Sequence, residues 1–404
     1  METGRIGRRI AYWRDRRGFT QVDFGRLMGQ TRRWVQDLEG GQRQQDPRLS
    51  VLVRAAEVLR IPVGQLLMDS PVGPVSSPVP PPEAAAVIEV LYRPDGGVEE
   101  LLPLTELRRR LAFCCEAFQA CHYGALGRDL PLLLVMAQQS ATRASTEASE
   151  AHVVLSRVLQ LATSFLHKYG ASTAVQAAVV ADRALAAAER SGDAVAIGAA
   201  SRRVAKSLTY QQQPRAAVDF AMGAARRLHG DLAAVGPLGL STLGMLYLSA
   251  AISASAMERT TAGVRDAVEY VDQAAEAADQ QGADLNADWT AFGPTNVSLH
   301  RIDVLARFED GWSALEAAES MDDRAVQGLA HERRAGYLIT KARAQLLTRK
   351  KEAAAESLVA ASRLAPEEFK GRPNTVALVK DVVGATAVPS GELRALAARC
   401  GLPA

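Results

Sequence analysis

The sequence predicts an all-α protein in which a small N-terminal domain is joined to a long body of paired helices. Aromatic residues make up only 5% of its 404 residues while alanine is abundant, which favours closely packed helices over sheets. Apolar residues and alanines recur three and four positions apart over segments of helical length. One stretch breaks this pattern, because six of the 18 prolines fall within residues 71–82. We therefore expect residues 70–83 to be an extended linker between a domain at 1–69 and a body at 84–404.

The first two helices of the N-terminal domain are bounded by clear signals. One is expected over Gly4–Arg17, where apolar residues have helical spacing and Gly18 follows. Thr20 is expected to cap a second helix, Gln21–Met28, which Gly29 ends.

Three more short helices complete the expected domain. Thr31 caps a third, Arg32–Glu39, which Gly40-Gly41 close. A fourth is expected to start at Asp46-Pro47, with aspartate as the cap and proline as the first helical residue. A last short helix supplies Leu66 and Leu67 to the core.

Charge is unevenly distributed between the two parts. Residues 1–69 contain 13 arginines, no lysine and 8 acidic residues, although the whole chain carries a net charge of only +2. The N-terminal domain is therefore basic and the rest slightly acidic, which indicates that one end of the protein meets a polyanion.

A second pattern in the N-terminal domain carries the functional interpretation. Two capped helices and a turn glycine stand at fixed offsets in the run Thr20-Gln21-x-x-Phe24-Gly25-x-x-x-Gly29-x-Thr31-x-x-x-Val35-x-x-Leu38-Glu39-x-Gly41. Over residues 4–69 the chain resembles the helix-turn-helix domain of the phage-repressor and xenobiotic-response-element family, with Gly25 in place of the usual alanine and Gly40 in place of the usual asparagine. The resemblance implies a five-helix fold that binds double-stranded DNA.

In this class the second helix of the motif enters the major groove. Arg32, Arg33 and Gln36 are about one turn apart on that helix, so we expect them to read base edges, arginine being the usual partner of guanine and glutamine of adenine. The resemblance also implies that Arg14 and Glu39 form a partly buried structural salt bridge.

Phosphate contacts are expected around the motif and would set register without reading sequence. By resemblance, Gln21 and Arg43 hold phosphates, and Thr31 and Trp34 are further candidates. Trp34 has an alternative role, which is to cover the first helix.

The body shows small residues at the offsets of a tetratricopeptide unit. One set is Ala342, Ala354, Leu358, Ala361 and Pro366, and shorter sets are Ala205, Ala217 and Ala224, and Ser255, Ala267 and Ala274. Such residues allow two helices to approach closely, so we expect irregular, long-helixed repeats of a tetratricopeptide-like α-solenoid. An alanine-rich helical bundle is the alternative. Residues 87–97 are expected to be either the start of a hairpin or a frayed helix.

This layout resembles regulators common in actinobacteria, which join a repressor-like domain to a tetratricopeptide-like body. Two segments look like their recurring landmarks, Tyr123–Pro131 and Phe292–His300. Related families sense a peptide or small molecule in the repeat groove, which the resemblance implies as a possibility here.

The second landmark supplies the candidate ligand residues. Thr295 is expected to cap a helix on which Asn296 and His300 are one turn apart, after Trp289 and Phe292. Asn296 and His300 have a purely structural alternative, which is to satisfy polar groups between helices. Further candidates for the pocket are Arg259, Arg301, Arg334 and Tyr337.

No motif of catalysis occurs: HExxH, GxxxxGK[ST], GxSxG and GxGxxG are all missing from the sequence. Cys114 and Cys121, with Cys115 and His122, form one candidate metal cluster, but on a single expected helix the outer two are about 10 Å apart along the axis. That spacing does not suit one zinc ion, so buried structural cysteines are expected. The sequence predicts no enzyme, no metal and no cofactor.

The expected cellular location follows from the lack of membrane and secretion signals in the sequence. The chain has no run of 18 consecutive apolar residues, and its N-terminal segment is too rich in arginine for a signal peptide. Four cysteines are too few for a disulfide scaffold, which favours a reducing cytoplasm.

These observations together predict a sequence-specific DNA-binding transcriptional regulator. The expected partners are a DNA operator, a second copy of the chain and a peptide or small-molecule effector, with no membrane. Two alternatives remain open: a helical-repeat adaptor for protein partners, and an antitoxin-like protein whose DNA binding is secondary.

Overall fold

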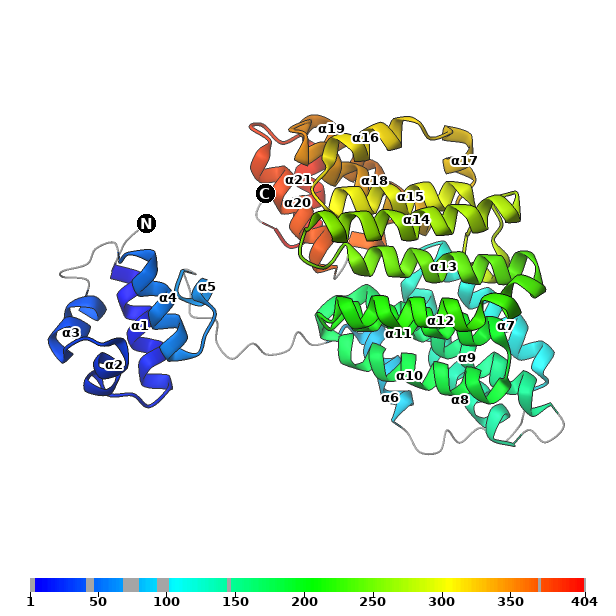
Figure 1. Cartoon of the computed structure of the whole chain (residues 1–404), viewed down its shortest axis with the longest axis horizontal. Coiled ribbons are helices and arrows are strands. Elements are labelled where there is room, and N and C mark those ends of the chain that lie inside the picture. The colour runs from blue at the N-terminus through cyan, green and yellow to red at the C-terminus, as the bar shows by residue number, and fades with distance from the viewer. Residues whose placement is uncertain are drawn as a thin grey trace. The chain divides into compact units, whose positions relative to one another are not determined.

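The computed structural model describes residues 4–40, 47–67, 80–92, 102–143, 147–369 and 372–402 (Figure 1). Within these residues every regular element is a helix and no strand occurs, which confirms the predicted all-α class. The chain divides into two compact units, Met1–Pro78 and Val79–Ala404, and the division falls inside residues 70–83.

The described part of the N-terminal unit contains the expected five helices. Their bounds are α1 (Gly4–Arg16), α2 (Gln21–Met28), α3 (Arg32–Gly40), α4 (Leu49–Leu59) and α5 (Val63–Leu67). One apolar core joins all five, because side chains from each of them are buried together, among them Ile10, Phe24, Val35, Leu59 and Leu66.

The start and end of α2 follow the predicted capping chemistry. The Thr20 hydroxyl accepts from the Asp23 N–H at 3.1 Å, and the Asp23 carboxylate accepts from the Thr20 N–H at 3.3 Å. This reciprocal arrangement satisfies two N–H groups that a helix start leaves unpaired. At the other end Gly29 has φ 68°, a left-handed conformation that glycine adopts without strain.

The predicted start of the fourth helix is wrong. Helix α4 begins at Leu49, with Arg48 as its N-cap and no side-chain capping bond. Arg48 is extended (φ −55°, ψ 145°), so helical geometry begins two residues after Pro47. Asp46, the expected cap, lies outside the described residues.

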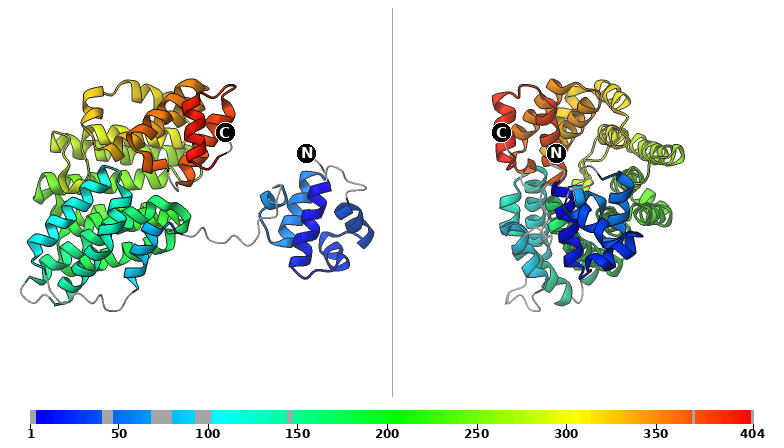
Figure 2. Two further views of the ribbon diagram at one scale, coloured as in Figure 1. Left: turned by 180° about the vertical axis from the view of Figure 1, so that it is seen from behind. Right: turned by 90° about the vertical axis from the view of Figure 1, so that its left-hand side faces the viewer.

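The body consists of helices that pack mainly against their neighbours in sequence (Figures 1 and 2). They are α6 (Pro82–Leu91), α7 (Leu104–Gln119), α8 (Tyr123–Arg143), α9 (Ala148–Leu166), α10 (Ala174–Ser191), α11 (Ala194–Tyr210), α12 (Pro214–Val235), α13 (Pro237–Ala254), α14 (Thr261–Gln281), α15 (Pro294–Arg307), α16 (Gly311–Glu319), α17 (Asp323–Gly328), α18 (His331–Leu347), α19 (Lys351–Leu364), α20 (Pro373–Ala385) and α21 (Gly391–Arg399). Short 3₁₀ turns lie at η1 (His167–Ser172), η2 (Ala287–Trp289) and η3 (Pro366–Phe369).

The small residues of the repeat pattern lie where paired helices touch. Ala205 on α11 and Ala217 on α12 are fully buried, as are Ala267 on α14 and Ala342 on α18. The pairs α11–α12, α13–α14 and α18–α19 are all in contact. These small residues are therefore buried on helices that contact their neighbours in sequence.

The first helix of the body corrects two boundaries. Helix α6 already includes Pro82 and Glu83, which the sequence assigns to the linker. It continues to Leu91, so the hairpin expected as one alternative for residues 87–97 does not begin there. Residues 93–101 lie outside the described part of the chain.

Segments from the two halves of the body meet. The 3₁₀ turn η3 inserts the fully buried Glu368 between Tyr123, whose hydroxyl donates to it, and Lys168, whose Nζ lies 2.9 Å from its carboxylate. Arg372 forms a third contact, an ion pair with the same carboxylate. These bonds tie η3 to the start of α8 and to η1, which lie 245 and 200 residues earlier in the chain.

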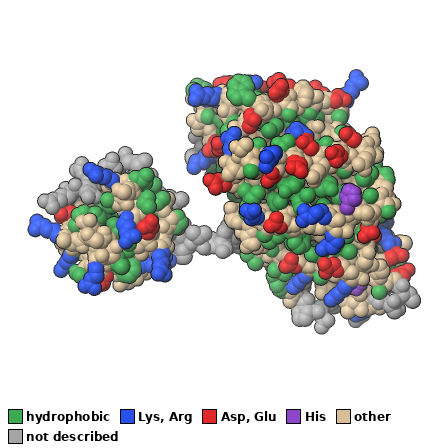
Figure 3. All heavy atoms as spheres, in the orientation of Figure 1, with side chains coloured by type: hydrophobic (Ala, Val, Ile, Leu, Met, Phe, Trp, Pro, Cys, Tyr) green, Lys and Arg blue, Asp and Glu red, His purple; other side chains and the backbone are tan. Residues whose placement is uncertain are grey.

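Helix α13 is long and apolar enough to cross a membrane, whereas the sequence was expected to contain no membrane-spanning helix. Its mean hydropathy is 1.3, but 67% of it is buried within the body. A helix buried to this extent belongs to the core of the body, and Figure 3 shows charged side chains of both signs over the visible face of the body.

Candidate DNA interface and candidate ligand cavity

The outward face of α3 presents the three predicted base-reading residues. Arg32, Arg33 and Gln36 are exposed, whereas Val35 and Leu38 on the opposite face are buried in the core. Within the described part of the chain, no hydrogen bond or ion pair engages the three exposed side chains, so they are free to meet an external partner.

A buried polar network holds α3 against α1 and α2. Arg14 Nε lies 2.6 Å from Glu39 Oε1 and its Nη2 lies 3.0 Å from Oε2, with both side chains less than a tenth exposed. The hydrogen bond to Glu39 raises the pKa of Arg14. The expectation of a partly buried structural pair is confirmed, and a two-point contact of this kind fixes orientation as well as distance.

Gln21 belongs to the same network. Its Nε2 donates to Glu39 Oε2 at 2.9 Å, which leaves the amide oxygen and a second N–H for other partners. The predicted phosphate contact of Gln21 therefore uses the part of the amide that Glu39 does not occupy.

The other predicted phosphate contacts are only partly described. Thr31 is exposed, and its hydroxyl accepts from the Trp34 N–H at 3.2 Å, as expected of a cap. Trp34 is half-buried and packs against the core of the N-terminal unit, in agreement with its alternative structural role. Arg43 lies outside the described residues.

Residues from several helices of the body line a cavity of about 730 Å³. That volume is typical of a small-molecule site. Nine arginine and lysine side chains line it, against three carboxylates. Helices α7, α9, α11, α13, α15 and α18 contribute to its walls, together with the loop before α15.

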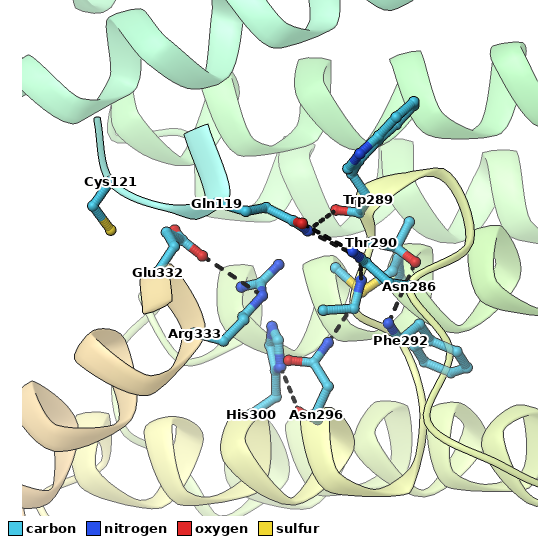
Figure 4. Close-up of polar contacts among 12 residues, drawn as sticks. Gln119, Cys121, Asn286, Trp289, Thr290, Phe292, Asn296, His300, Glu332 and Arg333 are labelled. Carbon is cyan, nitrogen blue, oxygen red and sulfur yellow. Dashed lines mark hydrogen bonds and ion pairs between the residues drawn. The ribbon is translucent and has the colours of Figure 1, made fainter. Parts of the chain in front are cut away.

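Two of the predicted ligand residues, Trp289 and His300, line this cavity (Figure 4). Asn296 is fully buried beside it; its amide Nδ2 approaches the Met245 sulfur at 3.6 Å, and its backbone oxygen bonds His300 Nδ1 at 2.8 Å. Phe292 is also fully buried and does not line the cavity.

The remaining predicted ligand residues are not brought to the cavity. Arg301 pairs with Asp272 at 2.5 Å, and the Tyr337 hydroxyl donates to the Ala318 carbonyl at 3.4 Å. Neither these two residues nor Arg259 and Arg334 lie among the cavity walls.

The loop before α15 differs from the expected cap. Helix α15 begins at Pro294, with the extended residue Gly293 as its N-cap and no side-chain capping bond. Thr295 lies inside the first turn, where its hydroxyl and its N–H both donate to the Asp284 carboxylate.

The same loop carries backbone strain close to the cavity. Asp288, Trp289 and Ala291 all have φ between 51° and 53°, which is unfavourable for residues other than glycine. Gln119 holds the loop to the end of α7 by bonding Asn286 at 2.9 Å and the Trp289 carbonyl at 3.2 Å (Figure 4). Strain retained in this way clusters at binding sites.

Sequence reasoning missed the charged residues of α11, Arg202, Arg203 and Lys206, all of which line the cavity. They are the only charged residues in this 17-residue helix, and that contrast is a signal present in the sequence. Burial, reinforced by the neighbouring Arg333, lowers the pKa of Arg203 to about 10. Burial, reinforced by Lys168 and Arg203, also lowers the pKa of Lys206 well below its usual value.

Two further titratable groups at the cavity are shifted in opposite directions. Burial, with Arg333 nearby, lowers the pKa of His300 to about 4 and keeps the ring neutral. Burial raises the pKa of Asp288 despite its ion pair with Arg157.

The cysteines are placed differently from the expected single helix. Helix α7 ends at Gln119, and Cys121 lies in the following turn with φ 62°. Cys114, Cys115 and Cys121 are buried, and burial raises the pKa of Cys114 to about 11 and of Cys121 to about 12. Among the described residues no group of three or more histidine, cysteine or acidic side chains is arranged to hold a metal ion.

Comparison with known proteins adds no identification. No family model matches the chain, and no curated protein is significantly similar to it.

Proposed function

We propose that this protein is a sequence-specific DNA-binding transcriptional regulator of the cytoplasm, whose body senses a ligand. One observation carries the DNA-binding part: Arg32, Arg33 and Gln36 stand free on the exposed face of a helix that is otherwise rigidly held. Their side chains have the donors and acceptors that recognise guanine and adenine in the major groove.

The frame around them supports the same proposal. The capped α2, the left-handed Gly29 and the Arg14–Glu39 pair fix α3 relative to its neighbours. A base-reading helix needs such a fixed orientation, because a bidentate contact tolerates little displacement. The likeness of residues 4–69 to the repressor family rests on these positions.

The body is proposed to provide dimerisation and sensing. A symmetric pair of chains would meet two half-sites about 34 Å apart. A ligand in the cavity would act by changing how the two DNA-binding units are held, and its effect on DNA affinity must equal the effect of DNA on ligand affinity.

The test is a titration of the full chain against the DNA upstream of its own gene. We expect wild type to bind this DNA tightly and to prefer it over unrelated DNA. The Arg32→Ala/Arg33→Ala/Gln36→Ala variant should lose that preference. The matched control is Arg8→Ala/Arg60→Ala. It also removes two positive charges, but from exposed positions on α1 and at the end of α4. Binding by wild type that never exceeds that to unrelated DNA would instead favour a protein-adaptor role.

A further inference from the structure

The cations of α11 have no counter-charge of their own. Among the described residues, neither a hydrogen bond nor an ion pair engages the side chains of Arg202, Arg203 and Lys206. Lys206 makes a cation–π contact with Tyr210 at 6.0 Å. Arg203 also has a buried Nε atom without a hydrogen-bond partner.

The nearest carboxylates are already engaged. Asp288 pairs with Arg157, and Glu332 lies 2.7 Å from Lys168 Nζ and 3.7 Å from Arg333 Nε. Asp303 pairs with Arg307 at 3.0 Å. The three α11 cations are therefore surplus to the internal ion pairs of the cavity.

Keeping these cations together is costly for the fold. They lie within one turn of each other, where like charges repel, and all three half-buried side chains line the same cavity. A solvated surface face would not explain the arrangement, because the rest of α11 carries no charge. Groups held at such cost are characteristic of binding sites.

The part of the cavity wall that α13 forms is different in kind. Helix α13 contributes Met245, Leu248 and Ile252, with two serines and no charged residue. Trp289 and Phe118 add aromatic surface. The cavity thus has a cationic wall on α11 and an apolar wall on α13.

We infer that the cavity binds an amphipathic organic anion, with its carboxylate, sulfonate or phosphate group on Arg202, Arg203 and Lys206 and its apolar part against α13. The volume of about 730 Å³ accommodates a small molecule of this kind. The regulatory meaning of this site rests on the proposed function, whereas occupancy by an anion does not.

The probe is 1-anilinonaphthalene-8-sulfonate, an aromatic anion, and its uncharged counterpart is N-phenyl-1-naphthylamine. We expect one sulfonate molecule to bind per full-length chain in a calorimetric titration. The Arg203→Gln/Lys206→Gln variant should bind it at least about tenfold more weakly, because each lost contact is charge-assisted, while its affinity for the uncharged dye changes little.

The matched control is Arg226→Gln/Arg227→Gln, which removes two exposed charges from α12, outside the cavity. Its sulfonate affinity should stay within about twofold of wild type. Equal losses in the two variants, or no saturable binding by wild type, would overturn the inference.

A second measurement depends on no variant. At constant ionic strength, inorganic pyrophosphate should displace the sulfonate dye from wild type, while uncharged glycerol should not. Failure of pyrophosphate to compete would also overturn the anion site.

DNA binding is then measured with and without the dye. Binding of the dye with unchanged operator affinity would leave the anion site standing and refute only its regulatory role. Absence of operator binding alongside dye binding would refute the DNA-binding proposal and leave the site intact.

Discussion

At the scale of single residues, the N-terminal unit separates side chains that hold the fold from side chains left for a partner. Glu39 accepts from both Arg14 and Gln21, so its carboxylate is used inside the unit. Three positions before it, Gln36 is exposed and unengaged by the described residues. One turn of α3 therefore holds the fold together, while the preceding turn presents a side chain that is available to a partner.

This separation predicts different phenotypes for single substitutions. Arg32→Ala, Arg33→Ala and Gln36→Ala should each weaken operator binding by about 1–3 kcal/mol and relax preference at one base position. Gln21→Ala should weaken binding to all DNA sequences by the same factor, because a phosphate contact does not distinguish between bases. Affinities for an operator library would check this, and a uniform loss in the Arg32 variant would show that Arg32 is not a base-reading residue.

At the scale of elements, close helix packing in the body depends on positions where no side chain fits. A Cβ added to Gly244 on α13 would lie 2.0–2.8 Å from the ring atoms of Phe292, and this ring is fully buried. Neither group can move aside easily, since the surrounding core is closely packed.

Gly244→Ala should therefore destabilise the body by about 1–3 kcal/mol, as expected of overpacking. Gly230→Ala on α12 is the matched control, because its Cβ would meet nothing within 4 Å. That substitution should instead stabilise the helix by up to about 1 kcal/mol. Urea unfolding of both variants gives the comparison, and destabilisation in both would contradict the packing explanation.

Local signals in the sequence were sufficient for some elements and not for others. Thr20 and Gly29 determine the ends of α2 through contacts within a few residues, so pattern and structure agree. Residues that lie far apart in sequence are different: Glu368 meets Tyr123 across 245 residues and Lys168 across 200. No periodicity contains that pairing, so the contact between these distant segments could not be predicted.

The candidate sites divide in the same way. The face of α3 could be predicted because one helix supplies all its residues. The ligand cavity draws its walls from helices spread over most of the body, and only Trp289 and His300 of the predicted set reach it. Arg301 was expected there on sequence proximity, but its side chain turns toward Asp272 on α14.

At the scale of the whole molecule, histidines with lowered pKa values make stability depend on pH. Burial lowers the pKa of His300 to about 4 and that of His167 well below 6.5. Below pH 6.5 the unfolded chain takes up protons that the folded chain does not, so stability should fall as pH falls from about 6.5 towards 4. Asp288, whose pKa burial raises, acts in the opposite direction.

The measurement that isolates this effect compares variants. His300→Gln should flatten the dependence of unfolding free energy on pH between about 6.5 and 4.5, whereas His229→Gln, at an exposed position of α12, should not. Parallel curves for wild type and His300→Gln would show that His300 is not responsible.

The cations that are proposed to bind an anion are expected to lower the stability of the body when no anion is bound. The pKa of Lys206 lies well below its usual value because burial and the neighbouring Lys168 and Arg203 disfavour its charged form. Replacing it by methionine keeps an unbranched side chain, one atom shorter, and removes the charge. Without an anion present, Lys206→Met should therefore raise the melting temperature of the body, by about 2–4 °C for each kcal/mol gained.

The sign of this effect changes with pH in a defined way. A lysine whose folded pKa lies below its unfolded value of 10.5 destabilises the fold fully at low pH, and the penalty disappears as pH rises towards 10.5. The gain from Lys206→Met should thus be larger at pH 7 than at pH 10, while exposed Arg227→Met should stay within about 0.5 kcal/mol of wild type. A Lys206→Met variant less stable than wild type at pH 7 would mean that Lys206 stabilises the fold, and that its charge is not held there at a cost to stability.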